Sequence, residues 1–437
     1  MESLIQKIKV DYPGYAEKTK NINFDQFINE VIGKNGTDTF MMMATIVDYF
    51  HDRHLDLFRT KDSIDKSLCE KNLIRINSYL NSGKKKKRYE GYWKTEANHC
   101  IIGIECVKEK PLQYRAYVVE CLDSIMIFPG MLFLDFKQES KDNFFTKATG
   151  TRTGWTYYVH SLFRNDSVFT TGPYYKWKKI NKYKAPLLPL LKRNSDSASG
   201  RWLDSITFMV SVPASSTANG VLIDTILNRN PAVKLKCRNL IIDVRNNTGG
   251  SVNAYDPLMP LLYTNPITYV NAAKYCSVDE GIYQKKVLDD YILKGGKDST
   301  YIKYTNTMIK YHTDSAGKYV EWQNDTLKLD TIYAHPKNVG IVINFACQSA
   351  CEIFLLDAKQ STKVKLFGEH TMGAIDYLNF YAQDLPSGKY KLYIATSRRI
   401  IPAGQNKLDG TGIYPDVPIA DTEKDWIDFV KKYYEKH

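Results

Sequence analysis

One serine stands where a nucleophile would gain most. Ser349 lies in a turn of small residues at 346–350, which follows an apolar, β-branched run at 339–344 and precedes an amphipathic segment at 353–356. This order predicts a strand, a tight turn and a helix, with the serine at the helix N-terminus. Free N–H groups and the helix dipole favour a developing anion there. A simple helix cap fits the same residues, because Glu352 would complete a capping box.

A pair of glycines follows a second apolar strand. Residues 240–251 read LIIDVRNNTGGS. Adjacent glycines let the backbone approach a ligand and direct N–H groups at it. Gly249 and Gly250 are therefore candidates for an oxyanion hole, together with the N–H of Ala350. An ordinary tight turn would use the same two glycines.

These motifs occur in a recognisable order along the chain. The segment Asp-x-Arg-Asn-Asn-x-Gly-Gly at 243–250, the Ser-Ala-Cys-Glu helix start at 349–352, and Gly-x-x-Thr-x-Gly at 368–373 resemble the tail-specific (C-terminal-processing) serine peptidases, a family that includes the tricorn core protease. The segment LDGTGIYPDV at 408–417 is similar to the Gly-Ile/Val-x-Pro-Asp signature of that family. The resemblance implies a serine nucleophile at Ser349 and an α/β fold with a ClpP/crotonase-like spiral core.

The identity of the general base separates branches of this family. The bacterial processing proteases use a lysine directly after Gly-x-x-Thr-x-Gly, and this chain has Ala374 there. Alanine has no proton acceptor, so a Ser-Lys dyad at that position is excluded.

Histidine is the remaining type of base, since its ordinary pKa lies near neutrality. The tricorn-like branch implies His54 as the base, with Asp409 in the place of the acidic helper three residues before Gly412. That branch has a serine before its histidine, whereas this chain has Arg53. His370, in the loop after the next strand, is the alternative base. Without the resemblance, His54 reads as a helix-terminal histidine.

The elements that position these residues suggest three parts. We expect an N-terminal helical domain over 1–82, a β-rich module over 89–180 that is PDZ-like or a small barrel, and a peptidase core over 200–437 with a polar insertion at 276–335. Expected elements are helices at 24–32 and from 37 to 50, a linker over 176–199, a helix around 287–293, a hairpin of 377–382 with 391–398, and a closing helix at 426–434.

Composition limits the function classes. The chain has 437 residues, is 43% hydrophobic and 25% charged, and carries a net charge of +12, which is typical of a globular protein with two or three domains. The positive charge is dispersed apart from 84–88, and no nucleic-acid-binding motif is present, so we expect no nucleic-acid partner. No apolar run is long enough for a membrane span. The eight cysteines permit disulfides without requiring them. No group of cysteines and histidines has the spacing of metal ligands, so we expect no structural zinc site.

The sequence therefore predicts a serine endopeptidase or C-terminal-processing peptidase that needs no cofactor or metal and acts on peptides or unfolded proteins. The resemblance implies a periplasmic, cell-envelope or secreted location, with a leader absent from this sequence. The main alternative is a catalytically silent peptide-binding protein on the same fold, because Ala374 and Arg53 both depart from catalytic patterns. An acyl-CoA hydrolase or isomerase of the crotonase superfamily is a third class, which the Ser-Ala-Cys-Glu helix start disfavours.

Overall fold

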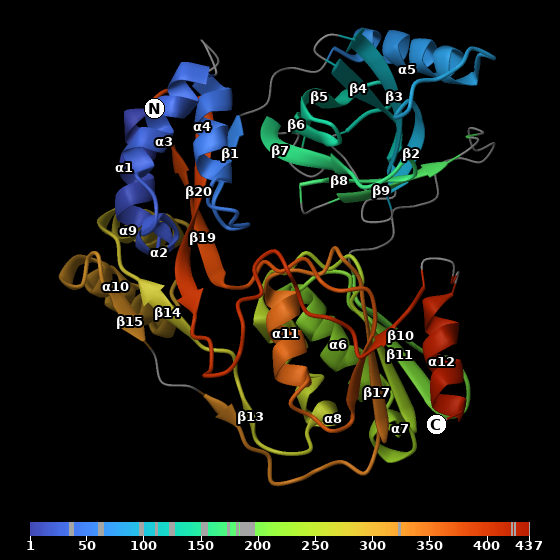
Figure 1. Cartoon of the computed structure of the whole chain (residues 1–437). Helices are drawn as coiled ribbons and strands as arrows, with labels where there is room; N and C mark the ends of the chain where they lie inside the picture. The colour runs from blue at the N-terminus through green and yellow to red at the C-terminus, as the bar shows by residue number, and fades with distance from the viewer. Residues whose placement is uncertain are drawn as a thin grey trace. The chain divides into compact units, whose positions relative to one another are not determined.

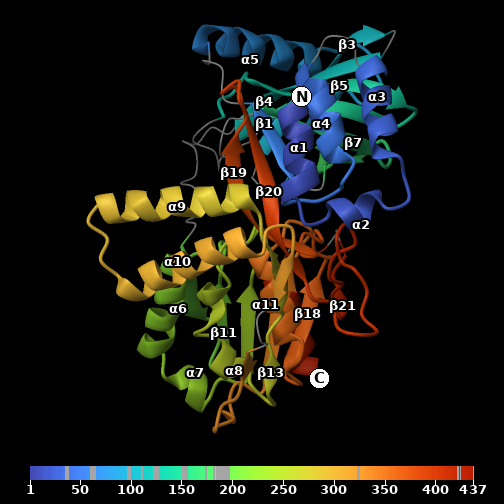
Figure 2. The same ribbon diagram turned by 90° about the vertical axis from the view of Figure 1, so that its left-hand side faces the viewer.

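The chain forms two compact units, each built from several chain segments. Figures 1 and 2 show the computed structural model, which describes all residues except 35–38, 60–64, 96–99, 110–111, 122–126, 150–155, 173–174, 181–182, 184–196, 322–324, 421–422, 424 and 437. The first unit comprises Met1–Phe58, Pro266–Lys328 and Gly373–Gly410. The second comprises Arg59–Asn265, Leu329–Met372 and Thr411–His437.

Helices open the first unit. They are α1 (Glu2–Asp11), α2 (Tyr15–Thr19), α3 (Phe24–Lys34) and α4 (Thr39–Asp48). Apolar residues at helical spacing, Leu4 with Ile8 and Phe24 with Ile28, bury one face of α1 and one face of α3. The expected helices at 24–32 and before residue 50 are confirmed. Residues 37–38, where the second helix was expected to begin, lie outside the described residues.

The first unit also contains an antiparallel sheet. Its strands follow the order β15 (Tyr319–Glu321), β14 (Ala272–Tyr275), β20 (Tyr390–Arg399) and β19 (Tyr377–Asp384). The β19–β20 hairpin was expected and is confirmed. The insertion carries two helices, α9 (Val278–Leu293) and α10 (Ser299–Asp314), where one was expected. Short strands β13 (Ile267–Thr268) and β16 (Thr326–Leu327) pair with each other, and β1 (Asp56–Arg59) spans the unit boundary.

A closed barrel lies in the second unit. Its eight described strands are β2 (Gly91–Thr95), β3 (Cys100–Glu109), β4 (Leu112–Cys121), β5 (Leu132–Ser140), β6 (Asn143–Thr149), β7 (Thr156–Phe163), β8 (Val168–Thr171) and β9 (Tyr175–Ile180). The order β7-β6-β5-β4-β3-β2-β9-β8 closes because β8 pairs back with β7. Fully buried aromatic side chains, including Trp93, Phe169 and Trp177, pack together within the module. Of the two expected alternatives, the structure has the barrel.

The boundaries of this module correct one expectation. Strand β9 occupies the beginning of the stretch 176–199, which was expected to be a linker, because aromatic and β-branched residues there complete the barrel. Helix α5 (Lys66–Asn81) precedes the barrel, and its N-cap Asp65 accepts a hydrogen bond of 3.1 Å from the Leu68 N–H.

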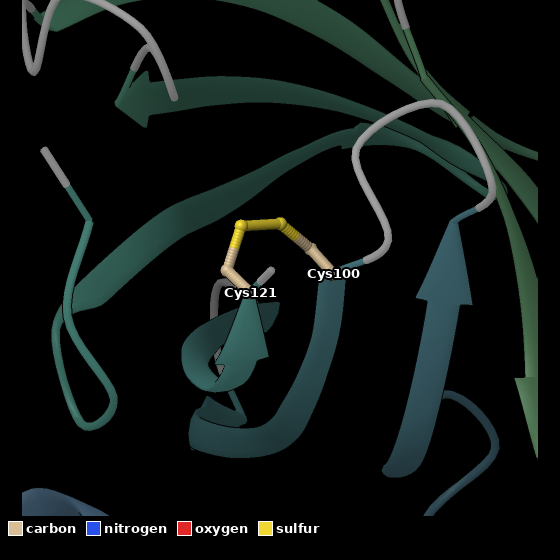
Figure 3. The surroundings of a disulfide bond; sticks show 2 residues. All are labelled: Cys100 and Cys121. Atoms are coloured by element: carbon tan, nitrogen blue, oxygen red, sulfur yellow. A yellow bond between two sulfur atoms is a disulfide. The ribbon is translucent and has the colours of Figure 1, made fainter. Parts of the chain in front are cut away.

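A disulfide joins two neighbouring barrel strands. Cys100 on β3 and Cys121 on β4 are directly opposite each other, and their sulfur atoms are bonded (Figure 3). The other six cysteines are free thiols. The even number of cysteines permitted a disulfide, but this pairing depends on strand register, which the spacing did not reveal.

The α/β core of the second unit is a six-stranded sheet. Its order is β10 (Ser199–Trp202), β11 (Thr207–Ser211), β12 (Asn239–Asp243), β17 (Asn338–Ile343), β18 (Val364–Gly368) and β21 (Val417–Pro418), parallel except for β10. Its helices are α6 (Thr217–Arg229), α7 (Ala232–Leu235), the 3₁₀ helix η1 (Val252–Tyr255), α8 (Met259–Leu262), α11 (Ala350–Ala358) and α12 (Trp426–Lys436).

Helices cover both faces of this sheet. Figure 1 shows α6 and α11 on one face and α12 on the other. Ile241, Val342 and Phe367 alternate with residues of the opposite face, and they pack against Val430 and Tyr434 of α12. Since both faces are buried, the central strands read as continuous apolar runs.

No helix of the described residues has the length and apolar character needed to cross a bilayer. Within the same ranges, no cluster of three or more His, Cys, Asp or Glu side chains could hold a metal ion.

The buried ring of Phe367 should matter for the stability of the core. Phe367→Ala would leave a cavity between the sheet and α12, so we expect a loss of about 3–5 kcal/mol in the free energy of unfolding. Urea denaturation followed by circular dichroism measures it. Phe380, whose side chain is 53% exposed, provides the matched control Phe380→Ala, with an expected loss below about 1 kcal/mol. Equal losses in the two variants would contradict this packing.

Candidate functional site

Ser349 occupies a strained position at the start of α11. Its φ of 56° and ψ of −123° lie outside the regions that L-residues favour, and it is the N-cap residue of the helix. Such a conformation costs on the order of 1–3 kcal/mol and needs support from its surroundings. The strand-turn-helix expected for 339–356 is confirmed, with Ser349 at the turn between β17 and α11.

Glu352 supplies that support. Its carboxylate has no exposed surface, and its Oε2 accepts a hydrogen bond of 3.1 Å from the Ser349 N–H. Its Oε1 accepts one of 2.5 Å from the hydroxyl of buried Thr371. Thr371 Oγ1 in turn accepts a hydrogen bond of 2.7 Å from the Ile413 N–H. One buried carboxylate therefore joins the serine turn to the Gly-x-x-Thr-x-Gly motif and to the segment around Ile413.

The two glycines of the second motif lie beside the serine. A methyl group at Gly249 would be 2.8 Å from the Ser349 Cβ, and one at Gly250 would be 2.1 Å from the Ser215 carbonyl oxygen. The φ angles of 89° and 135° also favour glycine at both positions. The close approach of the motif to Ser349 thus requires residues without a Cβ.

The two glycine N–H groups differ in their partners. The Gly249 N–H donates to Asn247 Oδ1 at 2.9 Å. The Gly250 N–H makes no hydrogen bond to any described residue, and Gly250 is exposed. Asn247 is fully buried, and its amide also donates to the Val212 carbonyl at 2.8 Å and to the Tyr255 hydroxyl at 2.9 Å. Asn247 therefore holds the Gly249-Gly250 turn in place through its buried side-chain hydrogen bonds.

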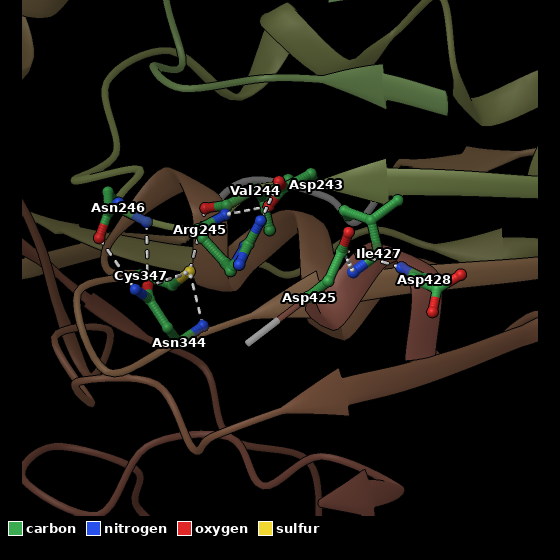
Figure 4. A network of polar contacts seen from close by, with 9 residues as sticks. All are labelled: Asp243, Val244, Arg245, Asn246, Asn344, Cys347, Asp425, Ile427 and Asp428. Atoms are coloured by element: carbon green, nitrogen blue, oxygen red, sulfur yellow. Dashed lines mark hydrogen bonds and ion pairs between the residues drawn. The ribbon is translucent and has the colours of Figure 1, made fainter. Parts of the chain in front are cut away.

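Polar contacts also join the ends of β12 and β17 (Figure 4). The Asn246 N–H donates to Asn344 Oδ1 at 2.9 Å, and the Asn344 amide donates to Asn246 Oδ1 at 2.9 Å. The thiol of Cys347 donates to the Val244 carbonyl at 3.1 Å. These contacts give the thiol a structural role and hold the two motif-bearing loops together.

His370 lies in the same unit as Ser349. Its ring packs between Phe345 and Tyr414, with centroid distances of 5.4 and 5.2 Å. Its Nδ1 is 2.8 Å from the Thr371 carbonyl oxygen, which makes Nδ1 the protonated nitrogen and leaves Nε2 as the potential proton acceptor.

His54 lies in the first unit, in the turn after α4, and is 7% exposed. Asp52 is its near neighbour, and Asp52 Oδ1 accepts a hydrogen bond of 2.8 Å from the His54 N–H. Burial lowers the pKa of the His54 imidazole, while the charge of Asp52 and a hydrogen bond at the Tyr377 backbone oppose that effect. His54 is therefore held mainly as the neutral imidazole, the form that can accept a proton.

Asp409 belongs to a cluster of carboxylates in the same unit. Its Oδ1 accepts hydrogen bonds from the N–H groups of Ile375 and Asp376, at 2.9 and 2.7 Å. Burial, followed by the charges of Asp52 and Asp376, raises the pKa of Asp409 to about 7. Asp376 is itself paired with buried Arg399 at 2.6 Å. Asp52 is therefore the carboxylate that acts on both His54 and Asp409.

The expected site residues thus fall into two groups. Ser349, Ala350, Gly249 and Gly250 come together in the second unit, which also contains His370, whereas His54 and Asp409 belong to the first unit. The sequence analysis did not identify three residues that support the candidate site residues: Thr371, Asn247 and Asp52. Asp52 could have been noticed, because it stands two residues before His54. The roles of Asn247 and Thr371 depend on hydrogen bonds between distant segments, which the sequence does not reveal.

The Thr371 hydroxyl offers a test of the buried network. Thr371→Val leaves the Ile413 N–H and one Glu352 oxygen without that partner, so we expect a loss of about 2–4 kcal/mol in the free energy of unfolding. Thr362→Val, at an exposed position in the same unit, should change it by less than about 0.5 kcal/mol. Chemical denaturation measures both variants. An unchanged free energy of unfolding in Thr371→Val would show that the network contributes nothing to stability.

Comparisons with known proteins agree with the motifs. Residues 224–419 match the model of peptidase family S41. No curated protein matches the sequence. Among solved structures, mature CPAF complexed with lactacystin is 12% identical, with a TM-score of 0.50 over 100% of this chain and 96% of that chain, which shows a shared fold.

Two further solved structures are less similar. A candidate peptidase from Parabacteroides merdae is 13% identical, with a TM-score of 0.45 over 99% of this chain and 94% of that one. The photosystem II D1 C-terminal processing protease is 12% identical, with a TM-score of 0.41 over 96% and 91% of the two chains. The segment 224–419, which carries the motifs around Ser349, therefore matches peptidase family S41, the tail-specific serine peptidases.

Proposed function

We propose that this serine peptidase cleaves peptides or unfolded proteins with Ser349 as its nucleophile. The observation that carries the proposal is the backbone of Ser349, whose φ of 56° places it on a sharp strand-to-helix turn. Strained turns of this kind present nucleophilic serines in other hydrolases. The Ser349 hydroxyl attacks the scissile carbonyl carbon, and its proton passes to the base as the oxyanion forms.

The oxyanion is stabilised by backbone donors on either side of the serine. The Ala350 N–H belongs to the first turn of α11, where N–H groups have no partner within the helix. The second donor comes from the Gly249-Gly250 turn. Gly250 is the stronger of the two candidates, because the Gly249 N–H already donates to Asn247. Gly249 contributes mainly by permitting the close approach of the turn to Ser349.

His54 is the proposed base. The neutral imidazole that its burial favours accepts the proton from Ser349 and later returns it to the leaving amine. Asp409 was the expected acidic helper. Asp52 has the more direct effect on His54, so we assign the orienting role to Asp52 and a supporting role to Asp409. His370 is the alternative base, through its Nε2.

The family match over 224–419 favours a peptidase over the silent binding protein. We further propose that the core over 200–437 is the ClpP/crotonase-like spiral, with an N-terminal helical domain over 1–82 and the β module over 89–180 as accessory parts. The Cys100–Cys121 disulfide supports a periplasmic, cell-envelope or secreted location, since disulfides persist in oxidising compartments.

Removing the nucleophile should abolish cleavage. Ser349→Ala is expected to lower kcat/KM on an unfolded protein such as casein by at least about a thousandfold, while the circular dichroism spectrum stays unchanged. Ser387→Ala, at an exposed turn of the β19–β20 hairpin, should retain wild-type activity. Wild-type cleavage by the Ser349 variant would refute the nucleophile.

The pH profile identifies the base. Activity requires neutral imidazole, so kcat/KM should rise with pH and reach a plateau, with a midpoint below the ordinary histidine value of about 6.5 because burial lowers the pKa of His54. Asp52→Asn removes a charge that raises this pKa, so the midpoint should move to lower pH. His54→Ala should abolish the activity.

The alternative base gives a different pattern. If His370 were the base, His370→Ala would abolish activity and His54→Ala would leave a measurable rate. The midpoint would then not respond to Asp52→Asn.

A further inference from the structure

A cavity of about 360 Å³ lies within the first unit, between the α9–α10 helices and the sheet. This volume is in the range of small-ligand sites. Strands β14, β19 and β20 supply one wall, and the two helices supply the other. The residues that matter for recognition are Lys274, Glu280, Tyr283, Tyr304, His312 and Phe380.

The buried charges of this cavity neutralise one another. Glu280 forms an ion pair with Lys274, and its Oε2 lies 3.7 Å from His312 Nε2. His312 Nδ1 accepts a hydrogen bond of 3.1 Å from the Ser277 N–H. Burial is the main reason that the pKa of His312 falls to about 4, so the ring is neutral near pH 7. A charged ligand group would therefore lose its hydration without finding a free counter-charge.

Aromatic side chains form the walls. Tyr304 is 60% exposed and Phe380 is 53% exposed, although both line the cavity. Tyr283 also lines it and packs against Tyr381, with ring centroids 5.4 Å apart. Exposed rings beside a cavity whose charges are already paired suit stacking against a flat apolar group, because aromatic pairs add to the free energy of burial.

A strand edge runs beside the same cavity. In the described residues, β19 pairs with no strand other than β20, so its other edge has no β-sheet partner there. The ladder between these strands skips Asn379, whose φ is 55° and which lines the cavity. Extended peptides bind such edges through backbone hydrogen bonds and place alternate side chains into pockets.

Phe380 connects the cavity with the proposed base. Its ring lies 6.0 Å from the His54 ring, centroid to centroid, at an interplanar angle of 32°. The cavity and His54 therefore share one wall residue within a single unit.

We propose that this cavity is a substrate subsite that accepts a large uncharged aromatic side chain from a peptide lying along β19. The proposal rests on the proposed peptidase function. Stacking on Tyr304 and Phe380 provides affinity, and the neutral interior excludes lysine and glutamate side chains.

Binding to the inactive Ser349→Ala chain tests the subsite without cleavage. The probes are blocked pentapeptides, acetyl-Gly-Gly-X-Gly-Gly-amide, with X as Tyr, Phe, Ala, Lys or Glu, titrated by calorimetry. We expect Tyr and Phe peptides to bind about tenfold or more tightly than the Ala peptide, and Lys and Glu peptides to bind no better than Ala.

A matched pair of variants locates the site. Adding Tyr304→Ala should reduce the aromatic preference about three- to tenfold. Tyr301, on the same helix, does not line the cavity, so adding Tyr301→Ala should leave the preference within about twofold. Equal affinity for all five peptides, or equal losses in both variants, would overturn the subsite.

Cleavage by the wild-type chain separates the two proposals. A kcat/KM preference for aromatic substrates that is lost with Tyr304→Ala supports the subsite. If aromatic peptides bind more tightly but are not cleaved preferentially, the cavity has no role in substrate selection. Failure of the nucleophile is seen separately, as undiminished cleavage by Ser349→Ala.

Discussion

The serine turn depends on one fully buried carboxylate. Glu352 accepts hydrogen bonds from the Ser349 N–H and from the Thr371 hydroxyl, and Thr371 holds the Ile413 N–H. A buried carboxylate is tolerated only when hydrogen bonds replace its hydration. The same bonds fix Ser349 in a conformation that would otherwise be strained, so the electrostatic requirement of Glu352 and the geometry of the proposed nucleophile are satisfied together.

A different balance operates around His54. Three carboxylates, Asp52, Asp376 and Asp409, lie close enough to affect one another, while Arg399 pairs with Asp376. Burial favours neutral forms in this cluster, which lowers the pKa of His54 and raises that of Asp409. Opposite shifts in neighbouring acids and bases are common where proton transfer occurs. These shifts fit the proton-accepting role that we propose for His54.

Local patterns predicted the elements best. The run 339–344, the turn before Ser349 and the hairpin around residue 386 were visible because apolar periodicity and turn residues agree there. The closure of the barrel was not visible in the sequence, because the pairing of β7 with β8 depends on contacts between separate segments. The same holds for the strand register that brings Cys100 opposite Cys121. Helix α10 was missed because its tyrosines and threonines obscure the helical pattern. The hydrogen bond from the Gly249 N–H to Asn247 Oδ1 could be found only in the folded chain.

The proposed function requires that Ser349 be an activated nucleophile. Reaction of the folded chain with a fluorophosphonate, followed by peptide mass spectrometry, tests it most directly, because such reagents phosphonylate serines whose hydroxyl is activated. We expect a single modified residue, Ser349, and no modification after denaturation. A protein that cleaves its substrate while the label falls on another residue, or while Ser349 stays unmodified under saturating reagent, would contradict it.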